Sequence, residues 1–82
     1  MKIKYSKDAV KFLEKQSKKT VIRIREAIMG LTKKPPEGDI TLMKGFSDGK
    51  KRLREGPWRI IYKVESKNIY IIDIGSRGDI YK

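Results

Sequence analysis

The chain has 82 residues, and its 21 lysines and arginines against 10 aspartates and glutamates give a formal net charge of +11, which favours an anionic partner. A chain of this length forms one domain, residues 1–82, whose thin core leaves little room for a deep cavity. It contains no cysteine and no histidine, which excludes disulfides, cysteine or histidine metal ligands, histidine general bases and the serine–histidine triad.

The first residues predict a short strand followed by a helix. The strand is expected at residues 3–5. Ser6 is typical of a helix N-cap, and Asp8 then lies in the first turn, where a negative charge suits the helix dipole. An apolar stripe extends this helix to about Gln16.

A second helix is marked by apolar residues at intervals of three and four, which lie on one side of a helix. They are Val21, Ile24, Ile28 and Leu31. Lys33 and Lys34 suit the C-terminal end of this helix, and Pro35 stops it. Only a few residues, near positions 17–19, join the two helices, which predicts an antiparallel hairpin.

The second half of the chain predicts an antiparallel sheet. A short strand is expected at residues 41–44, and three longer strands are expected at residues 50–55, 58–65 and 68–74. The connections between the last three strands are two residues long, which is typical of hairpins. The fold class is therefore α+β, with an N-terminal strand and a two-helix hairpin packed on a mostly antiparallel, curved sheet.

Successive side chains of a strand point to opposite faces, so each strand can be divided between two faces. The face toward the helices is expected to carry Ile60, Tyr62 and Val64 from one strand and Tyr70, Ile72 and Ile74 from the next. The other face carries Lys50, Arg52, Arg54, Arg59 and Lys63. Like charges on neighbouring strand positions repel, so we interpret this basic face as a binding surface for nucleic acid. The cations of the helices are interpreted as an ordinary solvated surface.

The available residue types limit the chemistry of this face. Arginine and lysine bind phosphates and stabilise the charge of a phosphorane, and a tyrosine or lysine transfers protons when nearby cations lower its pKa. RNA supplies its own nucleophile, the 2′-hydroxyl, so cations and one tyrosine suffice to cleave it. DNA lacks that nucleophile, and its hydrolysis usually requires a metal.

Tyr81, four residues after Arg77, is the candidate tyrosine. Each candidate also has a structural interpretation: Tyr81 would close the edge of the core, and Arg59 or Arg77 would pair with a neighbouring carboxylate. The remaining aromatic residues of the sheet are interpreted as core residues. They are Trp58, Tyr62 and Tyr70.

Three segments resemble the RelE/ParE superfamily of bacterial toxin–antitoxin toxins. They are residues 42–45 (LMKG), 53–62 (LREGPWRIIY) and 75–81 (GSRGDIY), and the resemblance extends over the whole chain. It implies a type II toxin. The RelE branch consists of mRNA interferases that cut codons in the ribosomal A site by 2′-hydroxyl attack, without a metal or other cofactor, and this branch is favoured. The alternatives are a ParE-like DNA gyrase inhibitor without nuclease activity and a toxin that only binds its antitoxin and operator DNA.

The resemblance implies a role for each residue that matches the family's motifs. Arg59 would stabilise the scissile phosphate, and Arg77 would stabilise charge or protonate the leaving group. Tyr81 would act as the general base or would orient the nucleophile by stacking. The remaining implied contacts are a backbone clamp of Lys50 and Arg52, and RNA contacts of Lys44, Lys51 and Arg54. Face alternation favours Lys50 over Lys51 as the clamp, and Ser76 stands where many relatives have histidine or lysine.

The implied partners follow from the same resemblance. They are mRNA in the ribosomal A site, ribosomal RNA, and an acidic, partly disordered antitoxin that folds across the basic face; operator DNA would be bound only through the antitoxin complex. No membrane partner is expected, because no apolar run approaches the roughly 20 residues of a membrane-spanning helix. The N-terminus has no secretory signal, so a cytoplasmic protein is expected.

Overall fold

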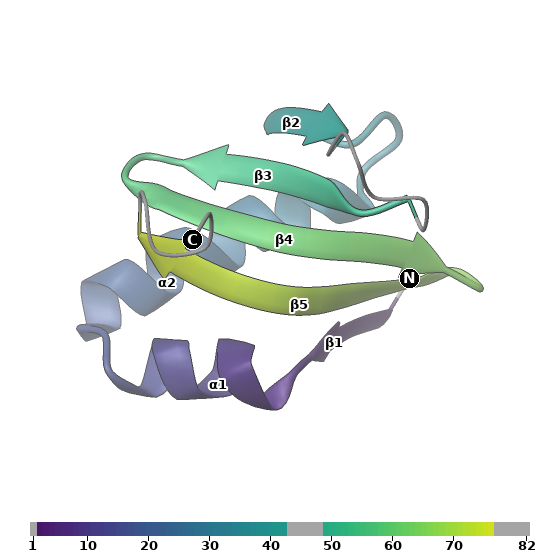
Figure 1. The fold of residues 1–82 in the computed structure, drawn as a ribbon. Helices are drawn as coiled ribbons and strands as arrows, with labels where there is room; N and C mark the ends of the chain where they lie inside the picture. The colour runs from purple at the N-terminus through teal and green to yellow at the C-terminus, as the bar shows by residue number, and fades with distance from the viewer. Residues whose placement is uncertain (1, 43–48, 77–82) are drawn as a thin grey trace.

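A five-stranded sheet with two helices on one side forms the structure, a computed structural model that describes residues 2–42 and 49–76. The elements in chain order are β1 (Lys2–Tyr5), α1 (Lys7–Glu14), α2 (Lys18–Met29), the 3-10 turn η1 (Gly30–Thr32), β2 (Asp39–Leu42), β3 (Lys51–Glu55), β4 (Trp58–Glu65) and β5 (Asn68–Ser76). The strand order is β1-β5-β4-β3-β2. β1 runs parallel to β5, and the other pairs are antiparallel (Figure 1), so the expected α+β fold is confirmed.

Two serines start the helices. The Ser6 hydroxyl accepts a hydrogen bond from the Ala9 N–H (3.1 Å) and donates one to the carbonyl of Ile72 in β5 (2.6 Å). Ser17 accepts from the Thr20 N–H at the start of α2 (3.2 Å). The predicted N-cap at Ser6 is thus confirmed, and its bond to Ile72 also ties the start of α1 to the sheet.

No helix in the described part of the chain is long and apolar enough to cross a membrane.

The strands differ from the sequence-based expectation mainly at their ends. β4 has the expected bounds, whereas β5 continues two residues further, to Ser76, and β2 begins two residues earlier, at Asp39. Val64, expected in the core, lies beside the β4–β5 turn at the end of the sheet and is 43% exposed.

A β-bulge in β5 changes which of its side chains face the helices. Ile61 of β4 pairs with Asp73, but the next residue, Tyr62, pairs with Ile71, so Ile72 is an extra residue in β5. An extra residue shifts the face alternation by one. Ile74 lies in the core as expected, but the residues before the bulge that lie there are Ile69 and Ile71. The placement of Tyr70 and Ile72 on the core face was therefore wrong.

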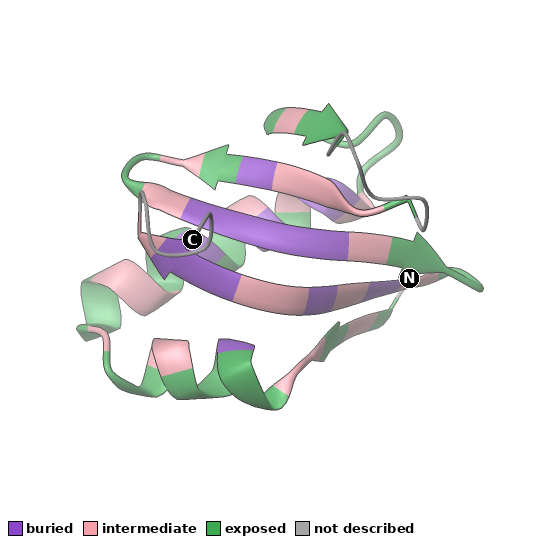
Figure 2. Ribbon diagram, in the orientation of Figure 1, coloured by how far each residue is buried: buried purple, intermediate pink, exposed green. Residues whose placement is uncertain are grey.

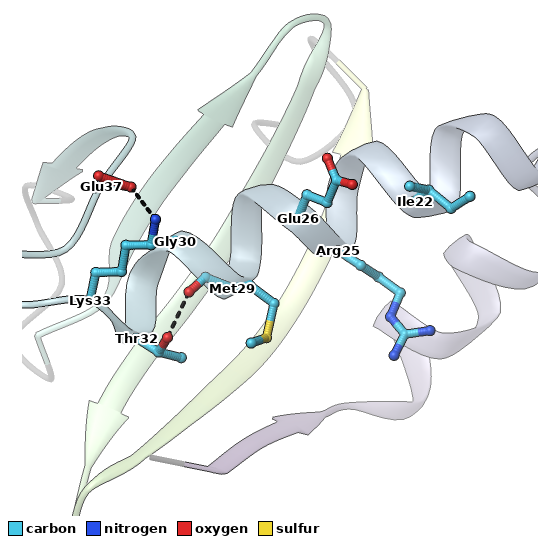
Figure 3. A pocket seen from close by; sticks show the side chains of 8 residues that line it. All are labelled: Ile22, Arg25, Glu26, Met29, Gly30, Thr32, Lys33 and Glu37. Atoms are coloured by element: carbon cyan, nitrogen blue, oxygen red, sulfur yellow. Dashed lines mark hydrogen bonds and ion pairs between the residues drawn. The ribbon is translucent and has the colours of Figure 1, made fainter.

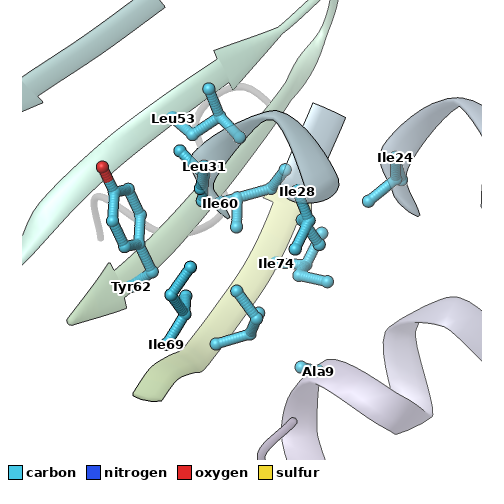
Figure 4. Packing of buried hydrophobic residues seen from close by; sticks show 10 residues of the cluster. Ala9, Ile24, Ile28, Leu31, Leu53, Ile60, Tyr62, Ile69 and Ile74 are labelled. Atoms are coloured by element: carbon cyan, nitrogen blue, oxygen red, sulfur yellow. The ribbon is translucent and has the colours of Figure 1, made fainter. Parts of the chain in front are cut away.

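The core lies between the sheet and the helices (Figure 4). Its buried members are Ala9, Ile24, Ile28, Leu31, Leu53, Ile60, Tyr62, Ile69, Ile71 and Ile74, and Trp58 packs against them. Buried positions concentrate in the two central strands, β4 and β5, while the outer strand β2 is mostly exposed (Figure 2). In β4, residues 59–62 are buried on both faces of the sheet. Arg59 therefore projects from a central strand that is buried along residues 59–62.

Candidate nucleic-acid interface

The face of the sheet opposite the helices carries three arginines from β3 and β4. Arg54 lies directly across from Arg59, and Arg52 lies across from Ile61. Their strand neighbours Leu53 and Ile60 point into the core, so these arginines point away from it. Two like charges on facing strand positions destabilise a sheet, and a bound anion would relieve the repulsion between Arg54 and Arg59.

Arg59 is buried although it belongs to this basic face. It is 7% exposed, and among the described charged residues it alone is buried. Its Nη1 donates to the carbonyl oxygens of Trp58 (3.2 Å) and Gly56 (3.4 Å). The β3–β4 turn thus fixes one edge of the guanidinium. A fixed guanidinium loses little entropy when it binds a phosphate, because its planar fork of donors is already oriented.

Arg23 of α2 supports the same turn from the other side. Its Nε lies 2.9 Å from Oε2 of Glu55, and its guanidinium carbon lies 5.1 Å from the centre of the Trp58 ring. Gly56 has φ of +58°, and a Cβ at Gly56 would lie 2.7 Å from Nη2 of Arg23. Two features therefore stabilise the turn that orients Arg59: the positive φ that Gly56 adopts, and the contacts of Arg23 from the helix layer. Sequence reasoning missed Arg23, because its contacts are 32 and more residues away in the chain.

A second group of polar residues lies at the far end of the same face. Tyr70 of β5 pairs with Lys4 of β1 on one side and with Lys63 of β4 on the other. The Lys4 ammonium lies over the Tyr70 ring, 5.9 Å from its centre. Sequence reasoning assigned Tyr70 to the core because it did not foresee the bulge. No local pattern predicts that β1 pairs with β5.

The structure brings together only part of the site predicted from the sequence. Arg52, Arg54 and Arg59 share the open face, and by alternation Lys50, which precedes β3, belongs to that face. Lys51 belongs to the other face, where it pairs with Tyr62. The remaining predicted site residues, Lys44, Arg77 and Tyr81, lie outside the described residues.

Tyr62 is a core residue, as expected. It is 2% exposed, and burial raises the pKa of its phenol above the ordinary value. A phenol with a raised pKa stays protonated at neutral pH, so Tyr62 is unsuited to the role of general base.

The helix layer carries a separate apolar groove, with a volume of about 480 Å³, along the outer side of α2 (Figure 3). Ile22 and Met29 line it and are 54% and 56% exposed. Two of its polar contacts are local: Thr32 donates to the Met29 carbonyl (2.7 Å), and Lys33 pairs with Glu37 (2.9 Å). Arg25 and Glu26 also line the groove, which lies on the helix side of the sheet, away from Arg52, Arg54 and Arg59.

Comparison with protein families finds one family model. The model described as ParE toxin of type II toxin-antitoxin system, parDE, matches residues 3–81. A search among curated protein sequences finds no match.

Several solved toxin structures share the fold. A chain of the archaeal RelE–RelB complex from Pyrococcus horikoshii has 28% sequence identity and a TM-score of 0.76, covering 95% of this chain and 96% of that chain. A chain of the RelB–RelE antitoxin–toxin complex from Methanococcus jannaschii has 25% identity and a TM-score of 0.75, covering 95% and 94%. The metal-bound toxin from Helicobacter pylori has 13% identity and a TM-score of 0.80, covering 98% of each chain. These likenesses establish a RelE-like α+β fold over nearly the whole chain.

Proposed function

The chain belongs to the ParE toxin family, within the RelE/ParE superfamily of type II toxin–antitoxin toxins, and on this premise we propose that it is a ribosome-dependent mRNA endoribonuclease that inhibits translation in the cytoplasm. The observation that carries the proposal is the position of Arg59. It is a buried arginine, oriented by two backbone carbonyls, and it lies beside Arg54 on an open sheet face. Such a group suits a phosphate whose charge increases during a reaction.

The proposed reaction uses the substrate's own hydroxyl. The 2′-oxygen forms a bond to the adjacent phosphorus while the bond from phosphorus to the 5′-oxygen breaks. The proton of the 2′-hydroxyl goes to a base, and the departing 5′-oxygen receives a proton, so the products are a 2′,3′-cyclic phosphate and a 5′-hydroxyl. Arg59 stabilises the charge of the phosphorane in this scheme.

The remaining site residues are given the roles that the family resemblance implies. Lys50 and Arg52 clamp the RNA backbone, and Arg77 stabilises charge or protonates the leaving oxygen. Tyr81 is the base or orients the nucleophile. Further contacts to messenger or ribosomal RNA come from Lys44 and Arg54, whereas Lys51, on the other face of the sheet, is given no RNA contact.

The test is primer extension on a defined mRNA in a purified translation system. Wild type is expected to give new 5′ ends at A-site codons, and Arg59→Ala is expected to slow single-turnover cleavage by about 10²-fold or more. Arg77→Ala is expected to abolish the new ends. Arg25→Ala is the control, because Arg25 is an exposed arginine of α2 that lines the groove behind the sheet. Equal cleavage by Arg59→Ala and Arg25→Ala would remove Arg59 from the site.

Inhibition of DNA gyrase without nuclease activity is the second candidate function. The observation that favours it is the family model, which is that of ParE toxins and covers residues 3–81. Intact mRNA with wild type in the translation assay, together with loss of gyrase supercoiling activity in its presence, would replace the first proposal with this one.

We also infer that the chain binds an acidic antitoxin. The similar chains from P. horikoshii and M. jannaschii come from complexes of RelE with RelB, and a net charge of +11 favours an acidic partner. Operator DNA would be contacted through that complex. An electrostatic interface weakens as salt screens it, so an antitoxin complex whose affinity is unchanged by added salt would contradict this inference.

A further inference from the structure

The open face of the sheet has a second end that the proposed site does not use. The strands β1, β5 and β4 are neighbours in the sheet (Figure 1), and their register places Lys4, Tyr70 and Lys63 side by side. We call these three residues the lysine–tyrosine row. They are displayed on the face that carries Arg54 and Arg59, because Ile71 and Tyr62, their neighbours in β5 and β4, point into the core.

Two contacts hold the Tyr70 ring on this face, one from Lys4 on β1 and one from Asn68 on its own strand. The Lys4 ammonium lies 5.9 Å from the ring centre, and the Asn68 amide lies 3.5 Å from the phenol oxygen. Lys63 forms an ion pair with Glu65 (3.0 Å). The Tyr70 side chain is only partly buried, so part of the ring stays accessible beside the Lys4 ammonium that lies over it.

A hollow of about 260 Å³ lies next to the ring, where β1 leads into α1. Its lining includes Lys4, Ser6, Tyr70 and Ile72. Ile72 is the extra residue of the bulge. The bulge thus both turns Tyr70 toward the open face and contributes an apolar side chain to the space beside it.

The spacing between the two ends of the face fits one short single strand. Lys63 follows Arg59 by four residues along β4, which is about 13 Å at roughly 3.3 Å per residue. Proteins that bind single strands combine a cationic track for the backbone with aromatic rings on which bases stack. The open face has both features, with the arginines at one end and the lysine–tyrosine row at the other.

We propose that the lysine–tyrosine row is a second nucleotide subsite, in which Tyr70 stacks on a base of single-stranded RNA whose adjacent phosphates contact Lys4 and Lys63. The subsite deepens the proposed function and rests on it for the identity of the RNA as substrate. It adds a contact away from the cleaved bond, so it contributes to binding and is not part of the chemical step.

The test measures binding, not cleavage. Fluorescence anisotropy with a labelled uridine oligonucleotide of about eight residues, a length within the site sizes of single-strand binders, gives the affinity. Tyr70→Leu keeps an apolar side chain but removes the ring, and it is expected to weaken binding by about tenfold, as loss of one stacked base does. Tyr70→Phe keeps the ring and is expected to bind within about twofold of wild type.

A charge-matched pair of variants tests the lysines. Lys63→Gln and Lys33→Gln each remove a lysine that is paired with a nearby glutamate, but Lys33 lies on the helix side. Lys63→Gln is expected to reduce the salt dependence of RNA binding by about 0.7 in log–log slope, the value for one phosphate contact of a single strand. Lys33→Gln is expected to leave the slope unchanged.

Photo-crosslinking keeps the test independent of any change in folding. Wild type with the same oligonucleotide carrying 4-thiouridine is expected to give a crosslinked peptide that contains Tyr70. The inference is overturned if crosslinks form only elsewhere, if Tyr70→Leu binds RNA as tightly as wild type, or if wild type binds a glutamate-rich peptide through Tyr70 and does not bind the RNA. Tyr70-dependent RNA binding without ribosomal cleavage would instead support the subsite and reject the proposed nuclease.

Discussion

At the scale of single residues, two arginines of the open face differ in mobility: Arg54 is free to move, and Arg59 is fixed by hydrogen bonds. Arg54 is exposed and costs little to move, whereas Arg59 is 7% exposed and bonded to two carbonyls of its own turn. A flexible cation contributes mainly to attraction, while a fixed one contributes to the geometry of a transition state. This difference is the physical reason to assign Arg59, and not Arg54, to the reacting phosphate.

Substitution of Arg23 tests whether the β3–β4 turn contributes to cleavage by orienting Arg59. Arg23→Gln removes the ion pair to Glu55 and the cation over Trp58. Because the Arg23 side chain is 54% exposed, the variant is expected to lose only about 1 kcal/mol of unfolding free energy, measured by urea denaturation. Its single-turnover cleavage rate is expected to fall severalfold with RNA affinity unchanged, because the turn would no longer orient Arg59. Arg23→Lys, which keeps the charge, should restore part of the rate, and loss of RNA affinity instead of rate would contradict the positioning role.

At the scale of elements, the serine caps of the two helices provide a matched comparison. Ser6 both caps α1 and bonds to the Ile72 carbonyl in β5, while the described bonds of Ser17 stay within α2. Ser6→Ala is expected to cost about 1–2 kcal/mol of unfolding free energy, and Ser17→Ala about 0.5–1 kcal/mol, as N-cap losses do. Equal losses in urea titrations of the two variants would mean that the bond to β5 adds nothing.

The helix α2 allows a similar comparison between its two sides. Ile28 is fully buried in the core, and Ile22 on the same helix is 54% exposed. Ile28→Ala leaves a cavity and is expected to cost about 2–5 kcal/mol. Ile22→Ala is expected to change stability by no more than about 0.5 kcal/mol. A neutral Ile28→Ala in thermal or urea unfolding would show that this side of the helix does not pack on the sheet.

Local rules predict those elements whose signals lie within a few residues. The cap at Ser6, the bounds of β4 and the shared face of Arg52, Arg54 and Arg59 follow from spacing and alternation alone. The bulge in β5 could not be predicted, because it depends on how two strands fit together and leaves no mark in the composition. It determines the position of Tyr70, so this error in the fold is also the reason why the second end of the open face was missed.

The contacts of Arg23 illustrate the corresponding limit for the candidate site. Helical periodicity assigns Arg23 to an exposed surface, and it is indeed mostly exposed. Only the tertiary arrangement brings it to Glu55 and Trp58 across more than thirty residues of chain. Alternation therefore identifies which residues share a surface, but it cannot identify the residues from another layer that orient them.

At the scale of the whole molecule, the charge is spread over both layers. Residues 1–36 hold 11 lysines and arginines against three acids, and residues 37–82 hold 10 against seven. By net count the helical half is the more basic, although the arginines that share the open face belong to the other half. Total charge attracts RNA from a distance, whereas local placement determines where the RNA is bound.

Two triple variants of equal net charge separate these effects. Lys4→Gln, Arg54→Gln and Lys63→Gln together remove three cations from the open face; Lys11→Gln, Lys15→Gln and Lys18→Gln together remove three from exposed helix and loop positions. Each protein then has a net charge of 11 − 3 = +8.

If the open face is where RNA binds, the first variant is expected to lower the salt slope of RNA binding by about 2, since each lost phosphate contact removes about 0.7. The second is expected to slow association slightly and to keep the slope, because its cations only add to the long-range field. Equal slopes for the two variants, measured by anisotropy over a salt series, would mean that RNA is held by total charge alone and that the arginines of the sheet are not its binding site.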